Sequence, residues 1–84
     1  MWSARYVDLV PRERVPPYLT IAADLRRKIT NAELLPGEQV PSLDALSESY
    51  HVSRTTAQRA VRVLITEGLL ESRPRWGTFV AERR

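Results

Sequence analysis

The sequence predicts a mainly α protein with a small β-hairpin, in which three helices are followed by two short strands. Residues 53–67 place apolar side chains at helical spacing between a capping serine and a glycine. Two earlier stretches, starting near residues 17 and 42, show the same spacing after helix-start signals. After Gly68 the pattern becomes strand-like. A chain of 84 residues has room for one small domain of this kind.

The first helix is expected to begin at Pro16-Pro17, because proline suits the first helical turn. Its core-facing side chains, at helical spacing, are Tyr18, Ile21, Ala22, Leu25 and Ile29. We expect Arg26, Arg27 and Lys28 to be solvated. The pattern fades at residues 30–31, and the Pro-Gly pair at 36–37 indicates a turn before the next element.

The second helix is expected to run from Ser42 to about Tyr50, with Ser42 as N-cap and Asp44 favoured by the helix dipole. Its inward side chains are Leu43, Leu46 and Tyr50. His51 then occupies a sharp turn with positive φ, which histidine tolerates better than most residues. Val52 should point inward and Ser53 should cap the third helix, so the pair forms a helix-turn-helix.

The third helix has two unlike faces. Its apolar stripe consists of Ala57, Ala60, Val61, Leu64 and Ile65. The opposite side presents no acid and consists of Thr55, Gln58, Arg59 and Arg62, with Arg54 on the first turn. Arginine and glutamine carry groups that can read guanine and adenine edges, which favours a nucleic-acid surface. The alternative is an ordinary amphipathic helix with a basic outer side.

Residues 69–73 and 78–81 are expected to form the two strands, with residues 74–77 as the hairpin tip. An isolated hairpin is marginally stable, so it should pack on the helices through Leu70, Phe79 or Val80. Its tip would then extend sideways as a wing, with Arg73 and Arg75 beside a phosphate backbone or a minor groove. Trp76 would either contact a partner or cover the core.

Composition narrows the function further. The formal charge is +3, and residues 54–84 hold seven Arg against three Glu, so the positive potential belongs to the C-terminal part. The absence of cysteine excludes disulfides, a thiolate nucleophile and a zinc-finger site, and a single histidine cannot form a metal cage or a triad. We therefore expect no metal, no cofactor and no enzymatic activity. No apolar run approaches 18 residues and the N-terminus lacks the layout of a signal peptide, so a cytoplasmic protein without membrane contact is expected.

The chain resembles the N-terminal DNA-binding module of GntR-type bacterial transcription regulators over residues 17–81. The first part of the motif is Pro16-Pro17-Tyr18, Ile21, Leu25, Ile29, Leu34, Pro36-Gly37 and Pro41-Ser42. The stronger part is Leu46, Tyr50, Val52-Ser53-Arg54-Thr55-Thr56, Ala60, Leu64, Glu67-Gly68-Leu69 and Gly77-Thr78-Phe79-Val80. The resemblance implies a three-helix winged helix-turn-helix that inserts helix 53–67 in the major groove of double-stranded DNA, with hairpin 70–80 as the wing. It also implies a homodimer on a palindromic operator.

The chain departs from the family pattern at three places. Asp44 stands where relatives often carry Arg, so one contact from the second helix would be lost. Gln58 replaces another frequent Arg, which would favour adenine over guanine. The tip carries Arg75-Trp76-Gly77 instead of Gly-Arg/Lys-Gly, and this bulk disfavours deep entry into a minor groove. Relatives also continue into an effector-binding domain, so we expect no small-molecule effector to bind within this chain.

These observations predict a sequence-specific DNA-binding transcription regulator, and a repressor rather than an activator. The candidate DNA-binding residues are Ser42, Ser53, Arg54, Thr55, Thr56, Gln58, Arg59, Arg62, Arg73, Arg75, Trp76, Gly77 and Thr78. The alternative is a winged-helix protein–protein interaction module that uses the same helix and Trp76. Residues 1–16 would be an N-terminal arm that is either mobile or docked through Trp2, Tyr6, Val7 and Leu9, and residues 82–84 a tail.

Overall fold

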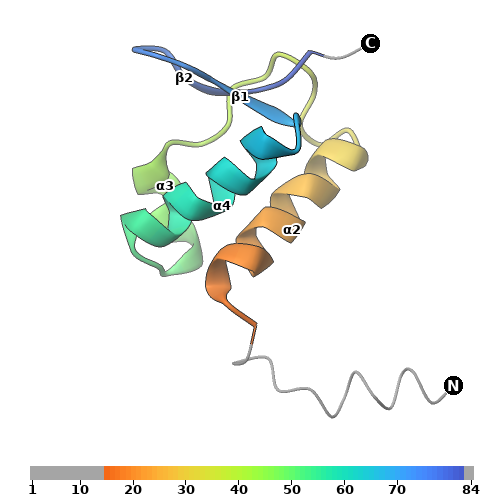
Figure 1. Cartoon of the computed structure of the whole chain (residues 1–84). Helices are drawn as coiled ribbons and strands as arrows, with labels where there is room; N and C mark the ends of the chain where they lie inside the picture. The colour runs from red at the N-terminus through yellow and green to blue at the C-terminus, as the bar shows by residue number, and fades with distance from the viewer. Residues whose placement is uncertain (1–14, 83–84) are drawn as a thin grey trace, which may run out of the picture.

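The computed structural model describes residues 15–82 and consists of three helices and one antiparallel hairpin. The helices are α2 (Pro17–Thr30), α3 (Leu43–Tyr50) and α4 (Arg54–Thr66). The strands are β1 (Leu70–Arg73) and β2 (Gly77–Val80). As Figure 1 shows, α2 and α4 lie side by side and α3 lies near the N-terminal end of α4. The hairpin follows α4 and packs against it through β1. The predicted fold class is therefore confirmed. The expected arm and tail fall largely on residues 1–14 and 83–84, outside the described residues.

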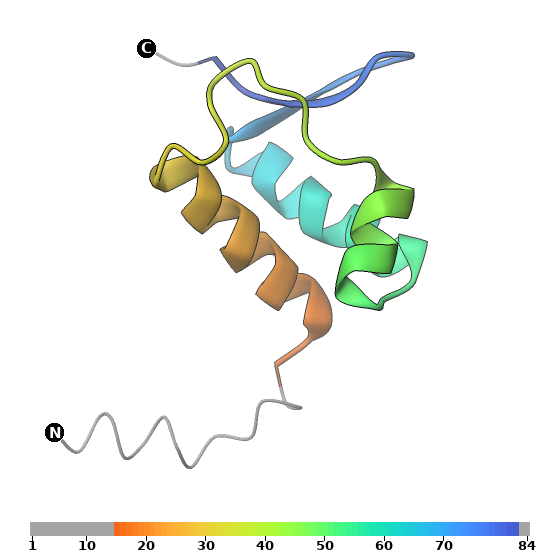
Figure 2. The ribbon, with the colours of Figure 1, turned by 180° about the vertical axis from the view of Figure 1, so that it is seen from behind.

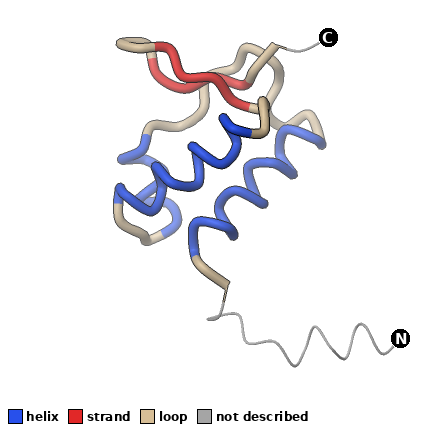
Figure 3. The backbone as a smooth tube through the Cα atoms, in the orientation of Figure 1, coloured by secondary structure: helices blue, strands red, loops and turns tan. Residues whose placement is uncertain are grey.

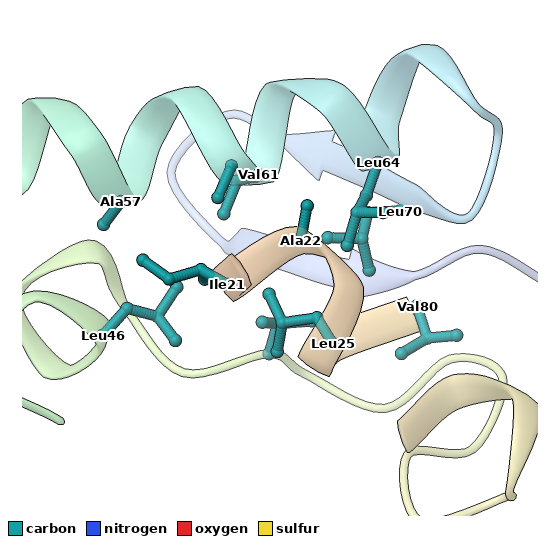
Figure 4. Packing of buried hydrophobic residues seen from close by; sticks show 11 residues of the cluster. Ile21, Ala22, Leu25, Leu46, Ala57, Val61, Leu64, Leu70 and Val80 are labelled. Carbon is teal, nitrogen blue, oxygen red and sulfur yellow. The ribbon is translucent and has the colours of Figure 1, made fainter. Parts of the chain in front are cut away.

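The core forms where α2, α3, α4 and the hairpin meet. Its most deeply buried large side chains are Ile21 of α2, Leu64 of α4 and Val80 of β2, each less than 2% exposed (Figure 4). The remaining buried residues are Ala22, Leu25, Val40, Leu46, Ala57, Ala60, Val61 and Leu70. The two alanines of α4 are fully buried, because small side chains allow α2 and α3 to approach this helix closely.

Both serine caps were predicted from the sequence and are present. The Ala45 N–H donates to Ser42 Oγ and the Thr56 N–H donates to Ser53 Oγ, each at 3.1 Å. His51 ends α3 in the left-handed region at φ 57°, so the predicted turn of the helix-turn-helix is confirmed. The two caps satisfy backbone groups at the starts of α3 and α4, and the turn at His51 separates the two helices.

Strand β2 is paired on both of its edges. The two strands form an antiparallel pair (Figure 3). Leu70 pairs with Val80 and Arg73 with Gly77, so β2 begins at residue 77 and not at residue 78 as expected. On the other edge of β2, Gln39 forms an isolated antiparallel bridge with Phe79, which the sequence did not indicate. The Val40 N–H donates to the Thr78 carbonyl and the Val80 N–H to the Glu38 carbonyl, both at 2.8 Å. Figure 2 shows the connection between α2 and α3 running past the hairpin.

Two polar clusters join α2 to the rest of the fold. Arg26 makes a bidentate ion pair with Glu67, just after α4, with donor–acceptor distances of 3.0 and 2.7 Å. Hydrogen bonds from Arg26 lower the pKa of the Glu67 carboxyl. The Tyr50 hydroxyl donates to Asp24, which also pairs with Arg27. The basic residues of α2 therefore remain partly exposed to solvent, as expected, and also form ion pairs that were not predicted.

One predicted core residue is placed differently. Ile65 was expected in the apolar stripe of α4, but it is 36% exposed. It lies at the edge of the stripe that faces the wing, and the hairpin packs on the helix through Leu70 and Val80 instead. The prediction for Ile65 is wrong because helical spacing alone does not say how far a neighbouring element covers a stripe.

Candidate nucleic-acid interface

The outer face of α4 is open to solvent. Thr55, Gln58, Arg59 and Arg62 are all exposed and line one shallow hollow on this side of the helix. The burial of Ala57, Ala60, Val61 and Leu64 fixes the rotation of α4 and therefore turns these four residues outward. The face offers guanidinium, amide and hydroxyl groups and no carboxylate.

Arg54 extends from the first turn of α4 and contacts α3. Its Nε donates to Asp44 Oδ1 at 2.7 Å, and the two side chains are 66% and 80% exposed. No other hydrogen bond joins this guanidinium to the described part of the chain. Its two terminal amino groups are thus available to an outside acceptor. Asp44 was expected to favour the start of the second helix and to remove a DNA contact, and its ion pair with Arg54 was not predicted.

Arg59 is oriented by α2. Its guanidinium carbon lies 4.2 Å from the centre of the Tyr18 ring, a cation–π geometry. Tyr18 is half-buried, so the ring serves both as a rim of the core and as a platform for Arg59. The core or rim role predicted for Tyr18 is compatible with this contact, but the pairing could not be read from the sequence.

The remaining predicted residues at the helix starts act first as caps. The Ser53 hydroxyl donates to Thr56 Oγ1 at 3.0 Å and accepts from the Thr56 backbone, so the Thr56 side chain is engaged locally. Ser42 caps α3 in the same way. Both serines are exposed at helix N-termini, where backbone N–H groups and the helix dipole favour an anion such as a phosphate.

The wing tip is held in one conformation by contacts with residue 39. The Gln39 side-chain amide donates to the Trp76 carbonyl at 2.9 Å, and the Trp76 N–H donates to the Arg73 carbonyl at 2.9 Å. Arg75 adopts φ 74° and Gly77 φ 119°. The Trp76 side chain is 74% exposed, so it does not cover the core. The tip therefore presents an aromatic ring and the Arg75 side chain to solvent.

Arg73 is less available than expected. It pairs with Glu71 at 2.5 Å, and its guanidinium carbon lies 4.7 Å from the centre of the Phe79 ring. Its carboxylate partner neutralises much of its attraction for a phosphate. Arg75, the other arginine predicted at the wing, is exposed and has no ion pair or cation–π contact with the described residues.

The helix face and the wing share a groove. Gln58, Arg62 and Ile65 of α4 line it on one side, and Ser72 and Thr78 of the hairpin line it on the other. A second hollow continues from Ser42 along the hairpin to its tip and is lined by Gln39, Pro41, Leu43 and residues 72–78. The two hollows join most of the predicted residues into one surface, and sequence reasoning missed Gln39, Leu43, Ile65 and Ser72.

The described residues contain neither a cluster of metal-ligating side chains nor a helix able to span a membrane. Within residues 15–82, no three His, Cys, Asp or Glu side chains gather closely enough to hold a metal ion. In the same part of the chain, no helix has the length and apolar character needed to cross a bilayer.

A helix-turn-helix with an exposed basic second helix and a paired wing defines the winged-helix class of DNA-binding domains. Residues 17–80 match the family described as bacterial regulatory proteins of the gntR family, and the chain belongs to that family. It is 41% identical over 69 residues to the mannosyl-D-glycerate transport/metabolism system repressor MngR of Escherichia coli, covering 82% of this chain and 29% of MngR. It is 37% identical over 68 residues to the transcriptional repressor NagR of Bacillus subtilis, covering 81% of this chain and 28% of NagR.

Solved structures give the same result. The AraR DNA-binding domain in complex with operator ORR3 is 33% identical and superposes with a TM-score of 0.77, over 80% of this chain and 81% of that chain. YtrA from Sulfolobus acidocaldarius, a GntR-family transcription factor, is 28% identical with a TM-score of 0.75, over 80% and 70% of the two chains. The predicted family is confirmed, and these likenesses favour a DNA-binding regulator over a protein-interaction module.

Proposed function

We propose that this chain binds double-stranded DNA sequence-specifically and represses transcription. The observation that carries the proposal is the acid-free outer face of α4, which is exposed and shares a groove with the wing. The repressor names of MngR and NagR support the regulatory direction. The chain spans under a third of the length of either relative, and we expect no small-molecule effector to bind within it.

In the proposed complex, residues 53–67 enter the major groove. Arg54, Thr55, Gln58 and Arg59 read base edges, and Arg62, on the third turn, contacts the backbone. The capped N-termini of α3 and α4 bind phosphates through Ser42, Ser53 and their neighbouring N–H groups. The wing crosses the adjacent minor groove, where Arg75, Trp76, Gly77 and Thr78 contact sugar and phosphate, and Arg73 and Thr56 contribute less. A protein acting on the bacterial chromosome works in the cytoplasm.

Duplex binding across a salt series tests this function. The logarithm of the binding constant should fall linearly with the logarithm of the salt concentration, with a slope of about −0.9 for each phosphate neutralised. Selection from a random duplex pool should then recover one preferred half-site. A flat salt response, or a bound pool with no enriched sequence, would contradict the proposal. An Arg62→Ala variant should have a shallower slope by roughly one unit if Arg62 contacts a phosphate.

A further inference from the structure

We infer that Asp44 is a specificity-determining residue, which positions Arg54 for a guanine contact and disfavours binding to other sequences. This inference rests on the proposed DNA-binding function. The sequence comparison with the family suggested only that an acid at this position removes a contact. The structure gives the acid a partner, at 2.7 Å, on the neighbouring helix of the helix-turn-helix.

The geometry of the pair leaves the two terminal amino groups of Arg54 without a hydrogen bond to the described residues. Asp44 accepts from Nε, on the inner edge of the guanidinium, and no further hydrogen bond links the two terminal amino groups to the described residues. Those groups can therefore donate in parallel to O6 and N7 of one guanine. A side chain already fixed at Nε also loses less rotational freedom when it binds.

Stability does not account for the pair. Both side chains are mostly exposed, at 66% and 80%, and exposed ion pairs contribute little to folding. The pair instead lies at the N-terminal ends of α3 and α4, where the proposed complex places phosphates. A carboxylate there repels phosphates and offsets the charge of Arg54, so Arg54 adds little to sequence-independent attraction. When a guanine lies within reach of Arg54, its two hydrogen bonds with the guanidinium compensate for the repulsion between Asp44 and the phosphates. Another base at that position does not make these hydrogen bonds.

The prediction is that Asp44→Asn lowers the ratio of specific to non-specific affinity by about tenfold, within the roughly 5- to 150-fold that one bidentate base contact contributes. Affinity for random duplex should rise, because one carboxylate near the phosphates is removed. Asp44→Glu keeps the carboxylate and should retain part of the preference. In an Arg54→Ala background, Asp44→Asn should have no further effect on base preference, since the residue acts through Arg54.

Parallel selections from one random duplex pool test this directly, using the wild-type chain, Asp44→Asn, Arg54→Ala and Glu33→Gln. Glu33 is exposed in the connection after α2, away from the α3–α4 turn, so its variant removes the same charge elsewhere. Wild type and Glu33→Gln should enrich the same motif, and Asp44→Asn and Arg54→Ala should lose a guanine at one shared position. If Asp44→Asn still enriches that guanine, the inference about Asp44 is overturned and the proposed DNA-binding function is not. If the wild type enriches no motif, the proposed function is contradicted, and the inference, which rests on it, is contradicted as well.

Thermal unfolding of each variant accompanies the selections. Asp44 also lies in the first turn of α3, where its charge favours the helix, so Asp44→Asn should unfold at a slightly lower temperature. A loss of base preference in a variant that is still folded at the selection temperature supports positioning. Equal losses at every position of the motif would indicate a structural role and would contradict the inference.

Discussion

The three arginines of α4 differ in what holds them. Arg54 is bound at Nε by Asp44, and Arg59 lies against the ring of Tyr18. Arg62 is exposed, and among the described residues it has no ion pair or cation–π contact. A side chain that is already oriented gives up less entropy on binding than a free one. We therefore expect Arg54 and Arg59 to determine sequence preference and Arg62 to contribute general affinity.

Replacing Arg54 by two different residues separates charge from shape. Arg54→Ala should cost about 1 to 3 kcal/mol on the preferred site and less on random duplex. Arg54→Lys keeps the charge but loses the planar fork, so it should be as poor as alanine on the preferred site and near wild type on random duplex. Fluorescence anisotropy with both duplexes measures the two losses. Full rescue by lysine on the preferred site would make Arg54 a phosphate contact.

Tyr50 is expected to make the stability of the fold depend on pH in the alkaline range. Burial, together with its hydrogen bond to Asp24, raises the Tyr50 pKa to about 12 from an unperturbed value of 10.0. The same hydrogen bond lowers the pKa of Asp24. Because the folded pKa of Tyr50 is the higher one, its contribution to stability is complete below pH 10.0 and is lost as the pH rises to about 12.

The variant Tyr50→Phe tests this contribution. At pH 8 it should be less stable than the wild type by about 1 kcal/mol, the typical net value of one hydrogen bond. The difference should shrink between pH 10 and 12, because there the Tyr50 phenol ionises in the unfolded chain but stays protonated beside Asp24 in the folded one. Chemical denaturation at several pH values measures both curves. Parallel curves through this range would show that Tyr50 does not titrate with unfolding.

At the scale of elements, local signals predicted more than long-range ones. The caps Ser42 and Ser53, the positive φ of His51 and the end of α4 near Gly68 all follow from one or two neighbouring residues, and all are present. The pairing of residues 37–40 with β2 was not predicted, because it joins segments about forty residues apart. Helical periodicity was likewise unable to show that Ile65 faces the groove instead of the core.

The wing depends on a glycine at position 77. This residue has φ 119°, and a Cβ built on it would lie 2.6 Å from Gln39 Nε2. Gly77→Ala should therefore destabilise the domain by about 1 to 3 kcal/mol, through backbone strain and displacement of the amide that holds the tip. Ser72→Ala, at an exposed position of β1 opposite Thr78, is the control and should change stability little. Urea unfolding compares them, and similar midpoints for the two variants would contradict the prediction.

At the scale of the whole molecule, the sequence predicted which residues are exposed at the candidate interface. It did not predict the contacts that these residues make with side chains of other helices. The outward face of α4 followed from periodicity, and the wing followed from its Pro and Gly. The contacts of Arg54 with Asp44 and of Arg59 with Tyr18 depend on where α3 and α2 cross α4, which no local pattern records. The residue types of the site can therefore be read from the sequence, whereas the orientation of its arginines depends on how the helices pack.

A single domain offers one short reading helix of 13 residues and one wing, which suits a short half-site. Regulators that bind as two-fold-symmetric dimers recognise a longer site, made of two half-sites about one helical turn, or 10 to 10.5 base pairs, apart. We predict that two copies of the chain bind a palindrome assembled from the selected half-site, and that one copy binds an isolated half-site more weakly.

Native mass spectrometry of three duplexes tests this prediction: the half-site alone, the palindrome, and the palindrome with about 5 base pairs inserted at its centre. The insertion rotates the second half-site to the opposite face of the duplex, so copies that contact each other on DNA should lose their mutual stabilisation. The first two duplexes should give one and two bound copies, and the palindrome should saturate at the lowest protein concentration. Equal affinity per half-site on all three duplexes would show that the copies bind independently and that the half-site, not the palindrome, is the unit this domain recognises.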